Sequence, residues 1–381
     1  MGCGARQRAG YGGLVPRVFC SPSRYVQGRD ATERLGAEMS ALGLKGPALI
    51  VASPSPRRLL EPVWQKSLTG EGMGFGLHPF AGECTLKEIE RIAAAARDLA
   101  AQIVIGAGGG KVLDAARAAA AKLGLPVVTC PTTAASDAPC SACSVLYTDG
   151  GEFDQLLFYP RNPDLVLVDT TVIARAPLRL LVSGMGDALA TWFEARTVIQ
   201  AHRPNQRHGA TTVAGEVLAR LCYETLLADG PAACEAVRHG VVTPALERLV
   251  EANTLLSGLG FESGGLAVAH SVHNGLTAAP GTHRYLHGEK VAFGLLVQLV
   301  LEGRPDDELG SVITFARQVG LPVTLAQVGL DDPDESILRQ IAERSLADGE
   351  TAHNEPFEIS AAMLVDAIVA ADALGARPGT A

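Results

Sequence analysis

Between residues 17 and 178, short apolar runs alternate with longer amphipathic ones. The runs PALIVAS, AQIVIG, LPVVTCP and DLVLVD are typical of buried strands, whereas TLKEIERIAAAARDLA has the apolar periodicity of a helix. This alternation predicts a doubly wound, Rossmann-like α/β domain with a mostly parallel sheet. In such sheets, ligands bind at the carboxyl ends of the strands.

From residue 179 to residue 381, strand patterns disappear and long apolar-periodic runs follow one another, among them VAGEVLARLCYETLLADG and TPALERLVEANTLLSGLG. These runs predict an all-α domain. A length of 381 residues fits two domains of roughly 100–200 residues each. We therefore expect an α/β domain at 17–178, a helical domain at 179–381 and an active site in the cleft between them. Residues 1–16 contain no apolar stretch typical of a secretory signal, and we expect them to form a disordered extension.

Composition restricts the possible partners and the compartment. A net charge of -9 argues against nucleic acid and anionic membranes as partners. No run reaches the ~20 apolar residues that span a bilayer. Eight cysteines in a chain of this length indicate free thiols in a reducing cytoplasm. The pair Cys140 and Cys143 forms a C-x-x-C, but it follows a loop and lacks a second pair, so we expect no redox or zinc role for it.

The glycine run GAGGGK at 106–111 lies between the strand AQIVIG and the helix KVLDAARAAAAKLG. It is not a Walker A loop, because Val112 stands where serine or threonine is needed. It is not the G-x-G-x-x-G fingerprint either, because Lys111 stands where the last glycine is needed. A strand, glycines and a helix N-terminus nevertheless present free backbone N–H groups to an anion. We expect an anion to bind here, and the run by itself leaves the kind of anion open.

Four residues in the helical half could bind a metal. Asp187 follows two glycines in GMGDALATWFEA, His270 and His273 are spaced i, i+3 on one helix face, and His287 precedes a glycine in HGEKVAFG. Histidines with a carboxylate suit a divalent cation. The alternative is that these are packed core histidines and a helix cap. The loop CPTTAASDAPCSACSVLY, which contains Asp137, is equally open to two interpretations, a polar ligand site or a capped turn.

Several longer motifs share an order and spacing with a known family. The runs GGGKVLDAARA, SDAPCSACSVLYTDGGEFD, NPDLVLVDTTVIARAP, GMGDALATWFEAR and HGEKVAFG resemble the glycerol dehydrogenases of the iron-containing alcohol dehydrogenase superfamily. The resemblance extends from about residue 18 to the last helix. It implies the dehydroquinate synthase-like fold of that superfamily and the oxidation of a polyol, glycerol, to dihydroxyacetone. It also implies NAD and zinc as cofactors and a homo-oligomer, with an octamer as the expected size.

The same resemblance assigns roles to matching residues. It implies that Asp187, His270 and His287 bind the metal and contact the substrate, and that Asp137 binds the substrate. Iron-using relatives carry a further histidine four residues after the aspartate, where this chain has Thr191, which favours zinc. His273 is a candidate for supporting a ligand or relaying a proton, with a packed helix histidine as the alternative. The implied dinucleotide contacts are Gly108, Gly109, Gly110, Lys111, Asp114, Thr132, Ser141 and Tyr147.

One departure bears on the cofactor. The strand PALIVAS ends in Ser53, where the resembled enzymes usually carry an aspartate for the adenosine ribose, and Arg57 and Arg58 follow. Loss of that carboxylate removes repulsion against a 2′-phosphate, so NADP is an alternative to NAD, unless the arginines simply begin a solvated helix.

The sequence also leaves the identity of the substrate undecided. A different vicinal diol or a hydroxyketone could replace glycerol, and a catalytically silent relative would carry the same fold. A phosphorylated polyol is disfavoured, because no Lys or Arg stands near Asp137 in its loop.

Overall fold

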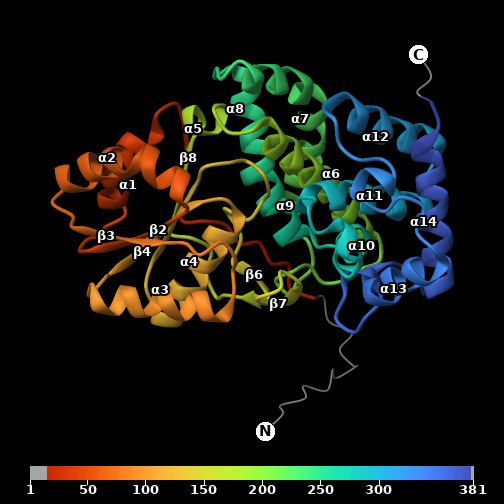
Figure 1. The fold of residues 1–381 in the computed structure, drawn as a ribbon, viewed down its shortest axis with the longest axis horizontal. Coiled ribbons are helices and arrows are strands. Elements are labelled where there is room, and N and C mark those ends of the chain that lie inside the picture. The colour runs from red at the N-terminus through yellow and green to blue at the C-terminus, as the bar shows by residue number, and fades with distance from the viewer. Residues whose placement is uncertain (1–14, 379–381) are drawn as a thin grey trace, which may run out of the picture.

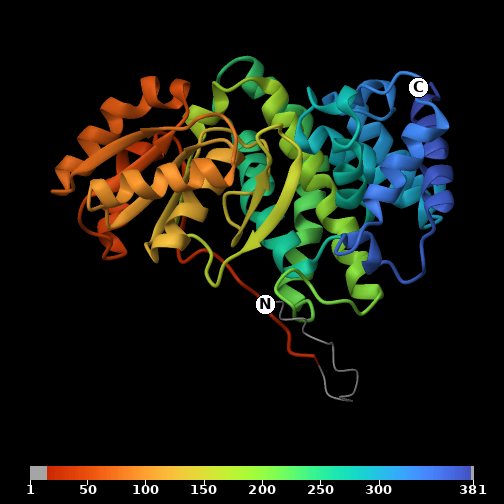
Figure 2. The ribbon, with the colours of Figure 1, turned by 60° about the horizontal axis from the view of Figure 1, so that its bottom comes forward.

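A computed structural model describes residues 15–378. Residues 1–14 of the expected disordered extension lie outside the described residues. Both views of the ribbon place the strands and helices of the first half, coloured red to yellow, at one end of the molecule (Figures 1 and 2). The green to blue helices of the second half lie at the other end. The predicted fold class, a Rossmann-like α/β half followed by a helical half, is confirmed.

The first half contains a six-stranded sheet in the order β1-β8-β5-β4-β2-β3, and every neighbouring pair in it is parallel. A separate antiparallel hairpin, β6–β7, follows the loop at 132–142. The strands are β1 (Tyr25–Gly28), β2 (Ala48–Ala52), β3 (Phe75–Pro79), β4 (Ile103–Gly108), β5 (Val127–Pro131), β6 (Cys143–Tyr147), β7 (Phe153–Phe158) and β8 (Leu165–Asp169). The helices are α1 (Leu35–Ala41), α2 (Pro54–Gly70), α3 (Leu86–Asp98), α4 (Gly110–Leu123) and α5 (Thr170–Ala174).

Side-chain alternation in the central strands explains why both faces of the sheet are covered. In β2, Ile50 packs with Trp64 of α2 on one face, whereas Val51 packs with Ile92 of α3 on the other. Strands buried on both faces have continuous apolar sequences, which is the pattern of PALIVAS and AQIVIG. The helices that follow β2 and β4 therefore lie on opposite faces, so the chain diverges between these two neighbouring strands. Ligands of open α/β sheets bind at such a point.

The strand register aligns the ends that carry polar residues. Ala52 of β2 pairs with Ala107 of β4, and Ala107 pairs with Cys130 of β5. Ser53, the glycine run and Thr132 consequently emerge at the same edge of the sheet. This edge faces the helical half of the molecule.

The second half is helical throughout its described part, in agreement with the periodicity of its sequence. Its helices are α6 (Leu178–Gln200), α7 (Val213–Arg238), α8 (Pro244–Glu251), α9 (Ser257–Gly264), α10 (Val268–Thr277), α11 (His287–Leu301), α12 (Asp306–Val319), α13 (Glu335–Ser345) and α14 (Ala361–Ala376). A π-helical turn, Ala252–Leu256, joins α8 to α9. The helix α6 begins at residue 178, next to the boundary expected from the sequence, while the division into two domains stays a prediction.

The main apolar core lies in the helical half and continues into the sheet. It combines side chains of α6, α7, α10, α11 and α14 with Val166 and Val168 of β8 and with Ala134 of the 132–142 loop. Because one apolar core includes residues of both halves, it holds the sheet against the helices. In the described part of the chain, no helix combines the length and apolarity needed to cross a membrane.

Glycines allow α6 and α11 to cross at very short range. A β-carbon on Gly288 would lie 1.8 Å from the carbonyl oxygen of Ser183, and one on Gly186 would lie 2.2 Å from the carbonyl oxygen of Gly288. No side chain fits in either place. Because Gly186 precedes Asp187 and Gly288 follows His287, this crossing sets the distance between two predicted metal ligands.

We predict that Gly288→Ala forces α6 and α11 apart. Overpacking of this kind costs about 1–3 kcal/mol, so the free energy of unfolding should fall by at least that range. Gly310→Ala is the matched control, because Gly310 is an exposed glycine within α12 with open space around its position. It should be neutral or stabilising by up to about 1 kcal/mol. Denaturant unfolding of both variants would test this, and equal stabilities would contradict it.

Candidate metal and dinucleotide site

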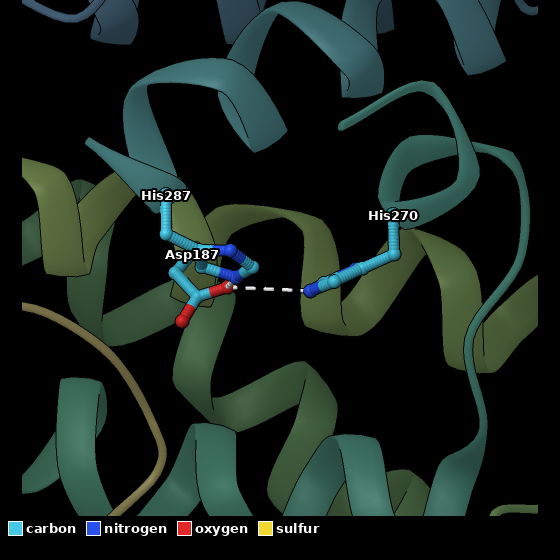
Figure 3. Close-up of side chains that lie close together, drawn as sticks. All are labelled: Asp187, His270 and His287. Atoms are coloured by element: carbon cyan, nitrogen blue, oxygen red, sulfur yellow. Dashed lines mark hydrogen bonds and ion pairs between the residues drawn. The ribbon is translucent and has the colours of Figure 1, made fainter. Parts of the chain in front are cut away.

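Asp187, His270 and His287 converge although they come from three different helices (Figure 3). Their ligand atoms all lie within 4.8 Å of one another. The Nε2 of His287 lies 3.0 Å from Oδ1 of Asp187, and the Nε2 of His270 lies 3.4 Å from the same oxygen. The three residues that the sequence predicted as metal ligands are therefore brought together around one carboxylate oxygen.

The electrostatics of this cluster favour a bound cation. Asp187 is 0% exposed. Burial by itself would raise the pKa of Asp187, but the charge and hydrogen bonds of His287 and His270 hold that pKa well below its usual range. Burial opposes protonation of His270, yet the carboxylates of Glu194 and Asp187 raise its pKa well above the ordinary value. A site with these properties binds positive charge, whether a proton or a metal ion.

Glu194 fixes the orientation of His270. Its Oε2 lies 2.6 Å from Nδ1 of His270, while its Oε1 accepts hydrogen bonds from the backbone N–H groups of Ala267 at 2.8 Å and of His270 at 3.1 Å. Since a carboxylate oxygen accepts hydrogen bonds, Nδ1 of His270 carries a hydrogen, and Nε2, which points at Asp187, is the nitrogen that a metal would bind in exchange for a proton. A carboxylate behind a metal-binding histidine is a common arrangement. Glu194 was not predicted from the sequence, although it lies seven residues after Asp187 on the same face of α6.

A chain of hydrogen bonds fixes the tautomer of His287 in the same way. Asn274 donates its amide N–H to Oε2 of Glu350 at 2.9 Å, so its Oδ1 faces Nδ1 of His273 at 3.0 Å. Nδ1 of His273 therefore carries a hydrogen, and its Nε2 accepts from Nδ1 of His287 at 3.0 Å. The Nε2 of His287, 3.0 Å from Oδ1 of Asp187, is then the nitrogen that a metal would bind. Burial, the neighbouring histidines and Lys290 lower the pKa of His273 well below its ordinary value, so it stays neutral.

The loop at 132–142 brings Asp137 to the cluster from the sheet side. The backbone N–H of Asp137 donates to Oδ2 of Asp187 at 3.2 Å, and its own carboxylate accepts from the Ser257 hydroxyl at 2.9 Å. Burial and the nearby Asp187 carboxylate raise the pKa of Asp137 well above its usual value. Thr191 bonds the Ser257 hydroxyl at 2.8 Å. The position where iron-using relatives carry a histidine thus supports Asp137 through Ser257.

Close packing holds this loop against α6 and the π-helical turn. A β-carbon on Gly184 would lie 1.8 Å from the carbonyl oxygen of Ala134. The same oxygen accepts a hydrogen bond from the Asn253 amide at 3.0 Å. Asn253 lies in the π-helical turn, a backbone form that is found frequently at functional sites. The sequence offers no local signal for this contact.

The glycine run lies at the carboxyl end of β4 and begins α4. No side chain caps α4 at Gly109, so its first backbone N–H groups stay available to an anion. Thr132 donates its backbone N–H to the carbonyl oxygen of Gly108 at 3.0 Å. The ammonium of Lys111 lies 4.8 Å from the ring centre of Tyr147 and 2.5 Å from Oε2 of Glu83. Most of the predicted dinucleotide contacts are therefore gathered around one loop.

Asp114 and Ser141 lie in the interior below that loop. Asp114 forms an ion pair with Arg117 at 2.8 Å and accepts from the backbone N–H of Val145 at 3.1 Å, and burial raises its pKa to about 6. The Ser141 hydroxyl donates to the Ala138 carbonyl oxygen at 3.3 Å. Both side chains have partners within the protein, so their role in cofactor binding stays a prediction.

Arg117, which the sequence analysis did not single out, is buried and donates to the carbonyl oxygens of Ala138 and Cys143. It fixes the C-x-x-C segment to α4. Cys140 and Cys143 are buried free thiols, and burial raises the pKa of Cys143 to about 12. A thiol of this kind is protonated near neutral pH and is a poor nucleophile.

A parallel sheet with a phosphate-type glycine loop, facing a helical half that carries an Asp-His-His cluster, defines a class of metal- and dinucleotide-dependent enzymes. The family model described as iron-containing alcohol dehydrogenase matches residues 22–170. A glycerol dehydrogenase of Escherichia coli is 47% identical over 363 residues, which cover 95% of this chain and 98% of that protein. The chain belongs to the iron-containing alcohol dehydrogenase family and is an oxidoreductase.

Two further comparisons bear on the reaction. A glycolaldehyde reductase of Halobacterium salinarum is 49% identical over 360 residues, covering 94% of this chain and 98% of that protein. The crystal structure of a glycerol dehydrogenase from Schizosaccharomyces pombe matches with a TM-score of 0.91 at 40% identity, covering 95% of this chain and 91% of that chain. Relatives with both names thus match over nearly the full chain.

We predict that Glu194→Gln weakens metal binding by about 10–100-fold. Glutamine offers one acceptor oxygen, which the two backbone N–H groups occupy. Its amide then donates to Nδ1 of His270 and moves the ring hydrogen to Nε2, the nitrogen needed by a metal. Competition for Zn²⁺ against a coloured chelator would measure the change. Glu216→Gln, which alters an exposed glutamate at the start of α7, is the control and should bind like the parent. Equal affinities of the two variants would refute the role of Glu194.

Proposed function

We propose that the protein oxidises glycerol to dihydroxyacetone, using zinc and a nicotinamide dinucleotide. The observation that carries the proposal is the pairing of Asp187, His270 and His287 with the Asp137 loop at the edge of the parallel sheet. The likeness to glycerol dehydrogenases over nearly the full chain supports the substrate. The proposal is consistent with a metal cluster on the helical half and an anion-binding loop on the sheet half, joined by the contact of Asp137 with Asp187.

The three ligand residues fit zinc. Both histidines have Nδ1 engaged and Nε2 directed at Oδ1 of Asp187, and this buried carboxylate supplies the negative charge. Three protein ligands that leave coordination positions for substrate are typical of catalytic zinc. Zinc held there would polarise a substrate hydroxyl as a Lewis acid and lower its pKa. Thr191 in place of a fourth ligand favours zinc over iron.

The glycine loop fits the pyrophosphate of the dinucleotide. Its backbone N–H groups at the start of α4 have no side-chain cap, and the ammonium of Lys111 lies beside them. Residues at the ends of β4 and β5 would hold the cofactor across the sheet edge. The nicotinamide ring would supply the hydride acceptor.

Residues of the chain itself would perform the remaining steps. The Asp137 carboxylate, held by Ser257, would accept a hydrogen bond from a substrate hydroxyl and fix which carbon faces the cofactor. His273 would keep His287 in its ligating tautomer. A proton-relay role for His273 is less favoured, because its depressed pKa and its bond to Asn274 keep it neutral.

A second candidate is reduction of a hydroxyaldehyde, which the likeness to glycolaldehyde reductase favours. Glycerol and glycolaldehyde both carry oxygens on adjacent carbons. Either could present two oxygens to one metal ion and a hydrogen bond to Asp137. The two activities therefore share the site and differ in the space required by the third carbon.

Assembly and compartment remain part of the proposal. Exposed Val213, Val217 and Leu221 follow one another at i, i+4 and i+8 on α7, which supports burial of this face in a homo-oligomer. Sedimentation velocity would measure its size. Buried free thiols support a reducing compartment, the cytoplasm.

The test is formation of reduced cofactor from glycerol, before and after chelation and zinc re-addition. We expect activity to be lost with the chelator and restored by zinc. Glycolaldehyde with reduced cofactor and ethylene glycol with oxidised cofactor should be run in parallel. Zinc-loaded protein that turns over only the two-carbon substrates would reject glycerol and support the second candidate. Turnover that survives complete metal removal would reject the metal-dependent mechanism.

The cofactor preference rests on Ser53, which lies between β2 and α2 and makes no side-chain capping hydrogen bond to α2. Arg57 pairs with Glu61 at 3.1 Å and Arg58 is exposed, so both can still turn toward a 2′-phosphate. We propose that the preference for NAD over NADP is weak.

Ser53→Asp should raise the ratio of kcat/KM for NAD to that for NADP by at least about tenfold, because a carboxylate binds the ribose hydroxyls and repels the phosphate. Ser55→Asp adds the same charge within the helix and should have a smaller effect. An unchanged ratio in Ser53→Asp would contradict the assignment.

A further inference from the structure

Lys290 lies in the first turn of α11, three residues after His287 and on the same side of the helix. It is only 6% exposed. Lysine is almost never buried to this degree unless its ammonium is paired with a negative charge. The position of Lys290 therefore needs an explanation that the sequence analysis did not supply.

No carboxylate in the described part of the chain forms an ion pair with Lys290. Its neighbour Glu289 binds Arg179 at 2.6 Å and the backbone N–H of Leu286 at 2.7 Å instead. Burial, and then the positive charge of Lys111, lower the pKa of Lys290 to about 8. Among the described residues, this largely buried lysine thus has no ion-pair partner, and its ammonium stays available to a ligand.

The charged neighbours of Lys290 belong to both halves of the molecule. Lys111, which acts on it, belongs to the first turn of α4 beside the glycine run, whereas His273, on which Lys290 acts, belongs to the metal side. Among the described residues, Lys111 pairs with the Glu83 carboxylate, whereas no carboxylate forms an ion pair with Lys290. This arrangement leaves an excess of positive charge next to a loop that offers free backbone N–H groups.

We propose that the Lys290 ammonium binds a phosphate oxygen of the dinucleotide and holds from the helical side the pyrophosphate that the glycine loop holds from the sheet side. The inference rests on the proposed function, because it requires a dinucleotide. A phosphate group of a substrate has the same chemistry. The dinucleotide is favoured because Lys111 and the glycine run lie on its side.

The experiment is calorimetric titration of the full-length, zinc-loaded protein with ADP-ribose, which carries the pyrophosphate, and with adenosine, which carries no phosphate. Lys290→Met should weaken ADP-ribose at least about tenfold, the effect of losing a hydrogen bond to a charged group, and should leave adenosine unchanged. Lys290→Arg keeps the charge and should retain most of the affinity. Lys122→Met, at an exposed lysine near the end of α4, is the control and should bind like the parent.

Thermal unfolding of the ligand-free variants separates binding from a structural role. Lys290→Met keeps the buried aliphatic part of the side chain and removes a charge that has no ion-pair partner among the described residues, so it should melt no lower than the parent. A sharp fall in its melting temperature would overturn the proposal, since it would mean that Lys290 is paired inside the protein. An unchanged affinity of Lys290→Met for ADP-ribose would also overturn the proposal. So would a Lys290→Met variant that loses binding to glycerol 3-phosphate but keeps its affinity for ADP-ribose. Parent protein that binds ADP-ribose in a Lys290-dependent way but does not oxidise glycerol would reject only the glycerol assignment.

Discussion

The buried negative charge of Asp187 is the constraint on which the site depends. A carboxylate without exposure to solvent normally takes up a proton, because desolvation penalises its charged form. Asp187 stays ionised because two histidines and the backbone N–H of Asp137 converge on it. These partners come from α10, α11 and the loop of the sheet half. One charge therefore connects three helices to the edge of the sheet.

Helix α6 carries the charged residue, Asp187, and also the glycines that let the partners of Asp187 approach. Gly184 lets the Asp137 loop approach, and Gly186 lets α11 approach. Two turns later on the same face, Glu194 orients His270. Small residues permit close backbone contact, and the carboxylates satisfy the polar groups that this contact buries. The glycines of the GMGD motif thus have a packing reason that is inseparable from the metal cluster.

The fold was largely predictable because its signals are local. Strand and helix periodicities lie within short windows, and the glycine run stands between one of each. The three metal ligands were suggested by residue type and by resemblance, since spacing alone does not bring residues from distant helices together. Glu194 was missed because a carboxylate within a helix usually faces solvent. The chain from Glu350 through Asn274 to His273 has no sequence signal, because each link depends on how α10 packs against later segments.

The tautomers of the two ligand histidines also affect how the site binds a metal and a substrate. Because Nδ1 of each ligand histidine is already engaged, both Nε2 atoms point toward Asp187 before any ligand binds, and little reorganisation is needed. Metal binding competes with protons for these nitrogens, so affinity falls as the pH drops. Two adjacent substrate oxygens would satisfy the cluster regardless of the length of the carbon chain. The loop around Asp137, which approaches the cluster from the sheet side, is the other part of the chain that a substrate bound there would contact.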